Sequence, residues 1–235
     1  MTDVHSHILF GIDDGSRTIS ESIELLKKLK SVGFNNVILT PHFILDSTYN
    51  SNYEANIKIY NELKERLISE NIDINIYLGN EIFIDKNVPT LLEKNIITSL
   101  NGTKYVLVEF PMHNKLLNIE DILYEIRSKG YEVVIAHPER YDAFKEDYSI
   151  VDTLREDGFL FQSNYSSILG YYGKDSIKLL KYMLKRHYID FLGTDIHRIE
   201  KTYVIDNFKK IEKHIIKVTG SEYYNKIQLN NNKLV

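Results

Sequence analysis

The sequence predicts an α/β protein whose parallel strands close into a distorted seven-stranded (β/α)7 barrel. Short apolar runs alternate with longer amphipathic segments along most of the chain. Each run is followed by a helix or a helical turn, which implies parallel strands joined by right-handed crossovers. There are seven such runs, and that number favours a closed barrel over an open sheet.

The seven runs are rich in Val, Ile, Leu, Phe and Tyr, the residue types that suit strands. We expect strands over residues 2–4, 36–40, 74–78, 105–109, 132–136, 160–162 and 189–193.

The segments between these runs carry apolar residues at helical spacing. In residues 19–32, Ile23 and Leu26 lie on one helical face. Thr18 and Glu21 form a capping box at the start of that segment. The same pattern predicts further helices over residues 53–68, 119–128, 150–156, 174–185 and 202–218.

Length and composition suit a single domain over residues 1–235, with a frayed polar tail from about residue 228 that contains three consecutive asparagines. The first residues include an acid where a secretion signal would have bases. No apolar run approaches the roughly 20 residues that span a bilayer. We therefore expect a cytoplasmic protein without stable membrane insertion.

Charge and cysteine content exclude several classes of function. The net charge of −4 disfavours a nucleic-acid partner. The chain has no cysteine, which excludes disulfides, zinc–thiolate sites and cysteine-dependent phosphatases. Any metal site must therefore use His, Asp, Glu, backbone or water oxygens.

Residues able to bind metal follow almost every predicted strand, where the chemistry of such barrels takes place. They are His5, His7, Asp13, Asp14, His42, Glu81, Glu109, His137, Asp195 and His197. Only the sixth strand lacks one and offers residues 162–164, Gln-Ser-Asn, instead. Imidazole together with carboxylate suits first-row divalent ions such as Mn, Fe and Zn.

The spacing of the histidines and the apolar surroundings of two glutamates favour metal binding by these residues over a chance arrangement. His5 and His7 are two residues apart, so both side chains share one face of an extended strand. Glu81 and Glu109 interrupt apolar runs, and a buried carboxylate is costly unless it is paired or bound to metal. A salt bridge to a nearby Lys or Arg is the alternative for such acids.

Seven short motifs contain these residues. The motifs are Asp-Val-His-Ser-His-Ile at 3–8, Gly-Ile-Asp-Asp-Gly at 11–15, Thr-Pro-His at 40–42, Gly-Asn-Glu at 79–81, Val-Glu-Phe at 108–110, Ala-His-Pro-Glu-Arg-Tyr at 136–141 and Gly-Thr-Asp-Ile-His at 193–197. Together they resemble one known family, the bacterial capsule-biosynthesis protein-tyrosine phosphatases of the CpsB/CapC type, which belongs to the polymerase-and-histidinol-phosphatase (PHP) superfamily. The resemblance extends from residue 3 to about residue 200, with the motifs in the same order.

The resemblance implies a distorted seven-stranded barrel of the PHP type with three divalent ions, manganese being the first expectation and iron or zinc the others. His5, His7, Glu81 and Asp195 would hold the first ion; Glu81, Glu109 and His137 the second; Asp14, His42 and His197 the third. Asp13 would support a ligand from behind. His42, Arg140 and Asp195 would be essential for catalysis.

Arg140 would also bind the substrate phosphate. Family members commonly carry a second arginine near a Pro-rich stretch after the last Asp-x-His motif. Here that region is Arg-Ile-Glu-Lys-Thr-Tyr at residues 198–203, without a matching Pro-rich stretch. Arg198 is the expected second phosphate contact, with Lys201 as the alternative.

The implied function is metal-dependent hydrolysis of phosphotyrosine in a protein, namely a tyrosine kinase that regulates capsular or exopolysaccharide synthesis. A small-molecule phosphatase of the histidinol-phosphate type and a nuclease-like phosphodiesterase are alternatives on the same scaffold. A non-catalytic regulatory module is a further alternative. The sequence leaves the oligomeric state open, a homo-oligomer included.

Tyrosine is abundant, with 17 residues that include the pairs Tyr171-Tyr172 and Tyr223-Tyr224. Such rings could form aromatic walls around a phosphotyrosine. For most of them we expect ordinary packing, because aromatic side chains usually serve cores.

Overall fold

The computed structural model describes residues 1–113 and 119–235. Nine strands lie within these ranges: β1 Thr2–Asp3, β2 Asn36–Leu39, β3 His42–Phe43, β4 Asn75–Leu78, β5 Glu81–Phe83, β6 Tyr105–Glu109, β7 Glu132–Ala136, β8 Leu160–Asn164 and β9 Ile189–Gly193. The α-helices are α1 Ile19–Ser31, α2 Tyr53–Ser69, α3 Val88–Glu93, α4 Ile119–Ser128, α5 Asp142–Glu146, α6 Ser149–Glu156, α7 Lys174–Lys185, α8 Tyr203–Asp206, α9 Phe208–Thr219 and α10 Ser221–Asn232. Short 3₁₀ helices are η1 Leu100–Gly102, η2 Pro138–Arg140, η3 Tyr165–Leu169 and η4 Ile199–Lys201.

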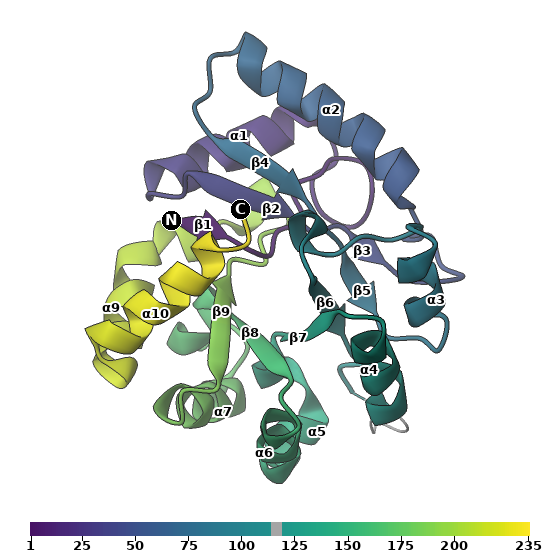
Figure 1. Ribbon diagram of the computed structural model, residues 1–235. Coiled ribbons are helices and arrows are strands. Elements are labelled where there is room, and N and C mark those ends of the chain that lie inside the picture. The colour runs from purple at the N-terminus through teal and green to yellow at the C-terminus, as the bar shows by residue number, and fades with distance from the viewer. Residues whose placement is uncertain (114–118) are drawn as a thin grey trace.

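All strand pairs among these residues are parallel, so the predicted α/β class is confirmed. One sheet has the order β1-β2-β4 and the other β3-β5-β6-β7-β8-β9. An isolated parallel bridge joins Ser6 to Ile196, which connects the segments after β1 and β9. In Figure 1 the strands gather in the middle of the molecule and the helices lie around them.

The predicted distorted seven-stranded barrel is confirmed only as a parallel α/β fold, because the described residues form nine strands in two sheets that are not closed into one. The predicted strands at residues 36–40 and 74–78 correspond to β2 and β4, and two short strands that were not predicted, β3 and β5, follow them and pair in the second sheet. Pro41 separates β2 from β3, and proline cannot donate a ladder hydrogen bond. Gly79 N donates to Leu39 O, and Glu81 N donates to Pro41 O, across the two interruptions. The chain therefore continues in the same direction while the regular ladder stops.

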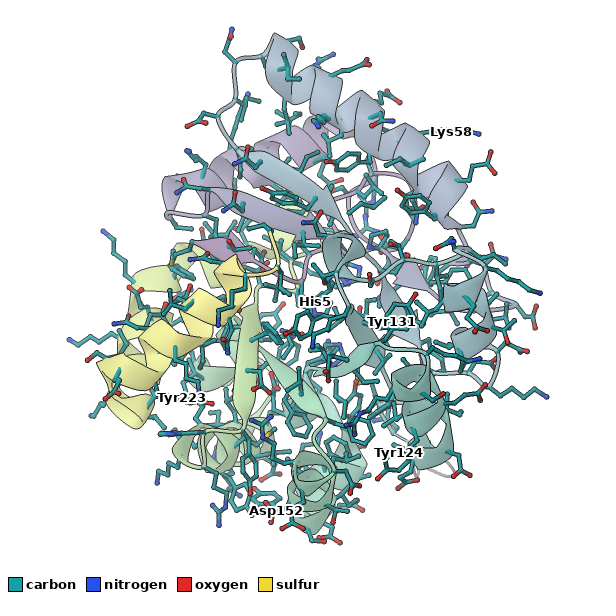
Figure 2. The ribbon with its side chains drawn as sticks, in the orientation of Figure 1. His5, Lys58, Tyr124, Tyr131, Asp152 and Tyr223 are labelled. Carbon is teal, nitrogen blue, oxygen red and sulfur yellow. The ribbon has the colours of Figure 1, made fainter. Side chains whose placement is uncertain are left out.

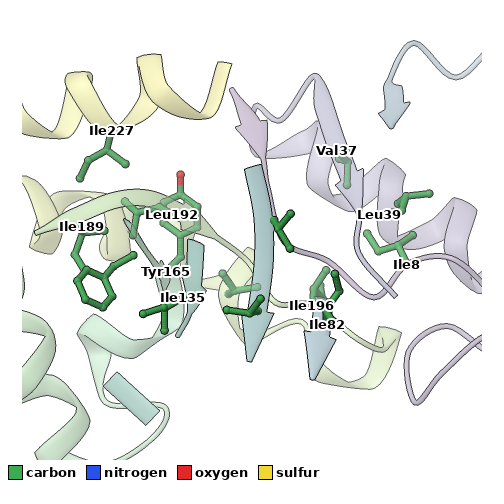
Figure 3. Close-up of a cluster of buried hydrophobic side chains, with 14 of the residues drawn as sticks. Ile8, Val37, Leu39, Ile82, Ile135, Tyr165, Ile189, Leu192, Ile196 and Ile227 are labelled. Carbon is green, nitrogen blue, oxygen red and sulfur yellow. The ribbon is translucent and has the colours of Figure 1, made fainter. Parts of the chain in front are cut away.

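Alternation along the strands separates an inner from an outer apolar layer. In β2, Val37 and Leu39 belong to the large core beneath the helices, part of which Figure 3 shows, whereas Ile38 belongs to a smaller inner cluster. In β6, Leu107 belongs to the same inner cluster. Glu109 lies two residues further, on the same face of the strand and at its carboxyl end. Apolar packing thus fills the interior below the polar residues.

Six predicted helices agree with the structure except where the last of them is broken. Residues 202–218 were expected to be one helix, but α8 and α9 are separated at Asn207. At the start of α1, Glu21 N donates to Thr18 Oγ1, as the capping box predicts. The Glu21 carboxylate does not complete the box and instead accepts from the N–H groups of Arg17 and Ile199. None of the described helices is both long and apolar enough to cross a bilayer.

The expectation of a frayed C-terminal tail is wrong, because residues 221–232 form α10. Asn231 is fully buried there. Its Nδ2 donates to the carbonyl oxygens of Thr2 and Leu192, and its Oδ1 accepts from Leu192 N. The amide therefore joins the last helix to both β1 and β9. The polar composition of this segment did not mean that its side chains are exposed to solvent.

Replacing Asn231 with Leu should lower the free energy of unfolding by about 2–4 kcal/mol, because it leaves three buried backbone groups without partners. Urea unfolding followed by circular dichroism measures the change. Asn225→Ala, at an exposed position of the same helix, should stay within about 0.5 kcal/mol. Equal midpoints for Asn231→Leu and the wild type would show that the buried amide does not tie the helix down.

Candidate metal centre

Glu81, the first residue of β5, lies at the centre of a cluster of histidines. Its Oε2 atom is 3.2 Å from Nε2 of His5 and 3.1 Å from Nε2 of His7. The same oxygen is 3.1 Å from Nδ1 of His42, and Oε1 is 2.7 Å from Nε2 of His137. Figure 2 shows His5 in the middle of the molecule, among the strands.

Two further carboxylates from distant parts of the chain reach the same cluster. Asp195 Oδ1 is 3.6 Å from His5 Nε2 and 3.4 Å from His7 Nε2. Glu109 Oε1 is 3.3 Å from His42 Nδ1, and its Oε2 is 3.7 Å from His137 Nε2. Both carboxylates lie at or just after the carboxyl ends of predicted strands, and their positions in the sequence therefore correctly predicted that they lie close together.

Asp14, His42 and His197 form the outer part of the site. Asp14 Oδ1 is 3.7 Å from His42 Nε2 and 3.5 Å from His197 Nε2. The ring of His197 stacks on that of His7 with centroids 3.9 Å apart. All nine sequence-predicted metal-binding residues therefore lie in one continuous cluster.

The donor set of this cluster fits divalent metal ions. Three groups have ligand atoms that all lie within 4.8 Å of one another: His7, Asp14, His42 and His197; His5, His7 and Glu81; His42, Glu81 and Glu109. Glu81 Oε2 and Asp14 Oδ1 are buried and have no hydrogen-bond partner among the described residues. A buried carboxylate oxygen of this kind is costly unless a cation offsets its charge.

The outer ring nitrogens of two histidines are held by neighbouring side chains. His7 Nδ1 lies 2.7 Å from Asp13 Oδ2, which supports the expectation that Asp13 acts from behind a ligand. His5 Nδ1 lies 2.7 Å from Gln162 Oε1. Each contact assigns the proton to Nδ1, so that Nε2 presents a lone pair toward Glu81.

Gln162 and Asn164 are functional residues that sequence reasoning missed. Gln162 Nε2 donates to Asn164 Oδ1, and Asn164 Nδ2 donates to Asp195 Oδ2 at 2.7 Å. This chain of amides from β8 links His5 to Asp195, which come from opposite ends of the sequence. The available signal was their position at the end of the sixth predicted strand, because every other predicted strand is followed by a candidate metal ligand.

Strained turns direct two of the side chains into the cluster. His137 and Asp195 have positive φ angles of 32° and 53°, in a backbone region that residues other than glycine adopt rarely. Such conformations cost about 1–3 kcal/mol each and are retained where the surrounding structure requires them. Gly193 allows β9 to approach closely, because a Cβ there would lie 2.6 Å from His5 Cβ.

Electrostatics within the cluster couple metal binding to protons. Burial lowers the pKa of His5, but the carboxylates of Glu81 and Asp195 outweigh burial and raise that pKa to about 9. Burial and the neighbouring His7 lower the pKa of His197 to about 4. Burial raises the pKa of Asp13, but His7 outweighs burial and holds it at about 2. Protons therefore compete with cations for the nitrogen of His5.

Arg140 lies between this cluster and a cavity of about 220 Å³. Its Nη1 donates to Asp195 Oδ2 at 2.9 Å, and its guanidinium lies over the Tyr172 ring, 4.7 Å from the centroid. The side chain is 25% exposed. An anion in the cavity can therefore reach the guanidinium without unfolding the site.

The two candidates for a second phosphate contact differ in position. Lys201, on η4, lines the cavity together with Arg140, Asp14 and His197. Arg198 is not among the residues found to line it, and its Nη1 atom is buried without a hydrogen-bond partner among the described residues. The geometry therefore favours Lys201 over the expected Arg198.

Comparison with known proteins gives consistent matches. The whole chain, residues 1–235, matches the family described as "Capsular polysaccharide synthesis, CpsB/CapC". Tyrosine-protein phosphatase YwqE of Bacillus subtilis is 34% identical over 85% of this chain and 78% of its own. Tyrosine-protein phosphatase CpsB of Streptococcus pneumoniae is 31% identical over 85% of this chain and 84% of its own.

The fold of this chain also matches a solved structure. That structure comes from work on YwqE of Bacillus subtilis and CpsB of Streptococcus pneumoniae, described as metal-dependent tyrosine phosphatases. It matches with a TM-score of 0.93 and 32% identity, over 100% of this chain and 94% of the other.

Proposed function

Because this chain belongs to the CpsB/CapC family of capsular polysaccharide synthesis, we propose that it is a metal-dependent phosphatase acting on phosphotyrosine in proteins. The observation that carries the proposal is the contact of one buried carboxylate, Glu81, with four histidines beside an accessible Arg140. Such a donor set suits hydrolytic metal ions, and the arginine suits a phosphate.

We assign the ligands as the family resemblance implies. His5, His7, Glu81 and Asp195 hold a first ion, Glu81, Glu109 and His137 a second, and Asp14, His42 and His197 a third. The ions supply a nucleophile ready at neutral pH and offset charge on the phosphoryl oxygens. Manganese is the ion we expect, and a distorted barrel of the PHP type is the scaffold we assign.

The protein's own side chains bind and orient the substrate. Arg140 donates to the phosphoryl oxygens, and its planar guanidinium can hold two of them at once. Asp195 holds Arg140 in position through Oδ2, while its Oδ1 faces His5 and His7. Asn164 also donates to Oδ2 of Asp195, which fixes the carboxylate plane.

The physiological substrate we propose is a tyrosine kinase that controls capsular or exopolysaccharide synthesis, and the place of action is the cytoplasm. The family's role in capsular polysaccharide synthesis supports that substrate. The negative net charge of −4 argues against long nucleic acids as substrates.

Removing metal with a chelator should lower phosphatase activity by at least about a hundredfold, since the residues alone do not make water nucleophilic. The experiment compares a phosphotyrosine peptide, histidinol phosphate and a phosphodiester after adding back Mn²⁺, Fe²⁺ or Zn²⁺. We expect the phosphotyrosine peptide with Mn²⁺ to react fastest. A preference for histidinol phosphate would favour the small-molecule alternative. Inertness with every ion would leave the non-catalytic module.

A further inference from the structure

The cavity beside Arg140 has a wall of aromatic rings that the proposed reaction does not yet use. Tyr171, Tyr172 and Tyr203 line it together with Asp14, Asp195 and His197. The rings of Tyr171 and Tyr203 lie 5.1 Å apart at 34°, and those of Tyr171 and Tyr172 lie 4.9 Å apart, edge to face. Tyr203 comes from a different segment than the adjacent Tyr171 and Tyr172, so its meeting with Tyr171 is a property of the fold.

The loop between η3 and α7 brings two of the rings to the cavity. It has the sequence Gly-Tyr-Tyr-Gly at residues 170–173. Gly170 and Gly173 have positive φ angles of 86° and 95°, which other residues rarely adopt. The loop therefore turns sharply at both ends and presents adjacent tyrosines toward the same cavity.

The two tyrosines of this loop have different surroundings. Tyr172 lies beneath the guanidinium of Arg140 and 3.4 Å from Asp195 through its hydroxyl. Tyr171 is 45% exposed although it is a large aromatic side chain. Tyr172 thus packs against the catalytic side of the cavity, and Tyr171 leaves ring surface open at its mouth.

The chemistry of an aryl phosphate matches this arrangement. A phosphate bound by Arg140 would lie in the cavity that Tyr171 and Tyr203 also line, so the group on its ester oxygen would be within reach of these rings. An aryl ring there can stack or pack edge to face on Tyr171 and Tyr203, whereas an alkyl chain forms only weaker contacts. Lys201 also lines the cavity and adds positive charge to it.

We propose that Tyr171 and Tyr203 form the binding site for the substrate's aromatic ring and give this protein a preference for aryl over alkyl phosphate monoesters. The inference rests on the proposed phosphatase function and deepens it. It assigns the preference to binding, so that it will appear in KM and in inhibitor affinity more than in kcat.

Inhibition by two phosphonates tests the proposal without leaving-group chemistry. Phenylphosphonate and butylphosphonate carry the same headgroup, with an aryl ring on phosphorus in the first and an alkyl chain in the second. In the metal-loaded wild type we expect the phenyl compound to bind about fivefold more tightly. Tyr171→Leu and Tyr203→Leu should each remove most of that difference, and Tyr171→Phe should keep it because the ring remains.

Tyr124→Leu is the matched control, because Tyr124 is also 45% exposed but lies on α4 and does not line the cavity. It should keep the wild-type inhibition ratio. An unchanged ratio in Tyr171→Leu and Tyr203→Leu, with phosphatase activity present, would overturn the aryl site alone. A wild type without activity toward any phosphate ester would overturn the proposed function itself.

Discussion

The variant Glu81→Gln should lose at least about a thousandfold in kcat/KM for a phosphotyrosine peptide and should bind fewer metal ions than the wild type. Glu81 is the one carboxylate in contact distance of His5, His7, His42 and His137 among the described residues. Glutamine keeps the volume but removes the charge, so its amide cannot offset two cations. Elemental analysis of the purified protein and steady-state kinetics measure the two effects.

A carboxylate elsewhere in the fold provides the control. Asp190 on β9 accepts from Arg155 and from Phe161 N and lies outside the metal cluster. Asp190→Asn should lower stability, because it weakens a partly buried ion pair, but should retain metal content and activity in the folded protein. If Glu81→Gln kept wild-type metal content and turnover, the central role of Glu81 would be wrong.

The variant Arg140→Met should lower kcat/KM by about 100- to 1,000-fold while leaving the bound metal unchanged. Arg140 contacts Asp195 only through the outer oxygen Oδ2, so its loss removes a phosphate ligand without removing a metal ligand. Arg140→Lys should give an intermediate loss, because lysine keeps the charge but lacks the planar fork. Inhibition by inorganic phosphate should weaken in the same order.

Arg186 offers a control of similar geometry. Its guanidinium lies 3.7 Å from the centroid of the Tyr182 ring, as Arg140 lies over Tyr172, but it does not line the cavity. Arg186→Met should therefore retain wild-type kinetics. A drop in metal content in Arg140→Met would mean that the arginine acts by supporting Asp195 and not by binding phosphate.

Several features of the site could be predicted because their signals are local. Glu109 ends an apolar run, and the energetic penalty for burying a lone carboxylate identifies it as paired or ligating in any fold. His5 and His7 share a strand face because the side-chain period of a strand is two residues. Asp13 was expected behind a ligand, and its carboxylate contacts His7.

Other features could not be predicted because they depend on contacts between distant segments. The amides of Gln162 and Asn164 look ordinary in the sequence, and only the approach of β8 to β1 and β9 gives them His5 and Asp195 as partners. Asn231 suggested a polar tail, yet it is buried because α10 packs on β9. Arg198 and Lys201 are three residues apart, and the turn of η4 decides which one lines the cavity.

By itself the sequence determined that this is a parallel α/β protein and which strand ends carry side chains able to bind metal. Hydrophobic periodicity and the energetic penalty of burying charge are properties of short segments, so they can be recognised without the fold. Only the tertiary structure decided that the strands form two sheets and that Glu81 is the shared centre. It also brought Tyr171 and Tyr203 to one cavity, since distances between remote residues depend on strand breaks and turns that no local pattern specifies.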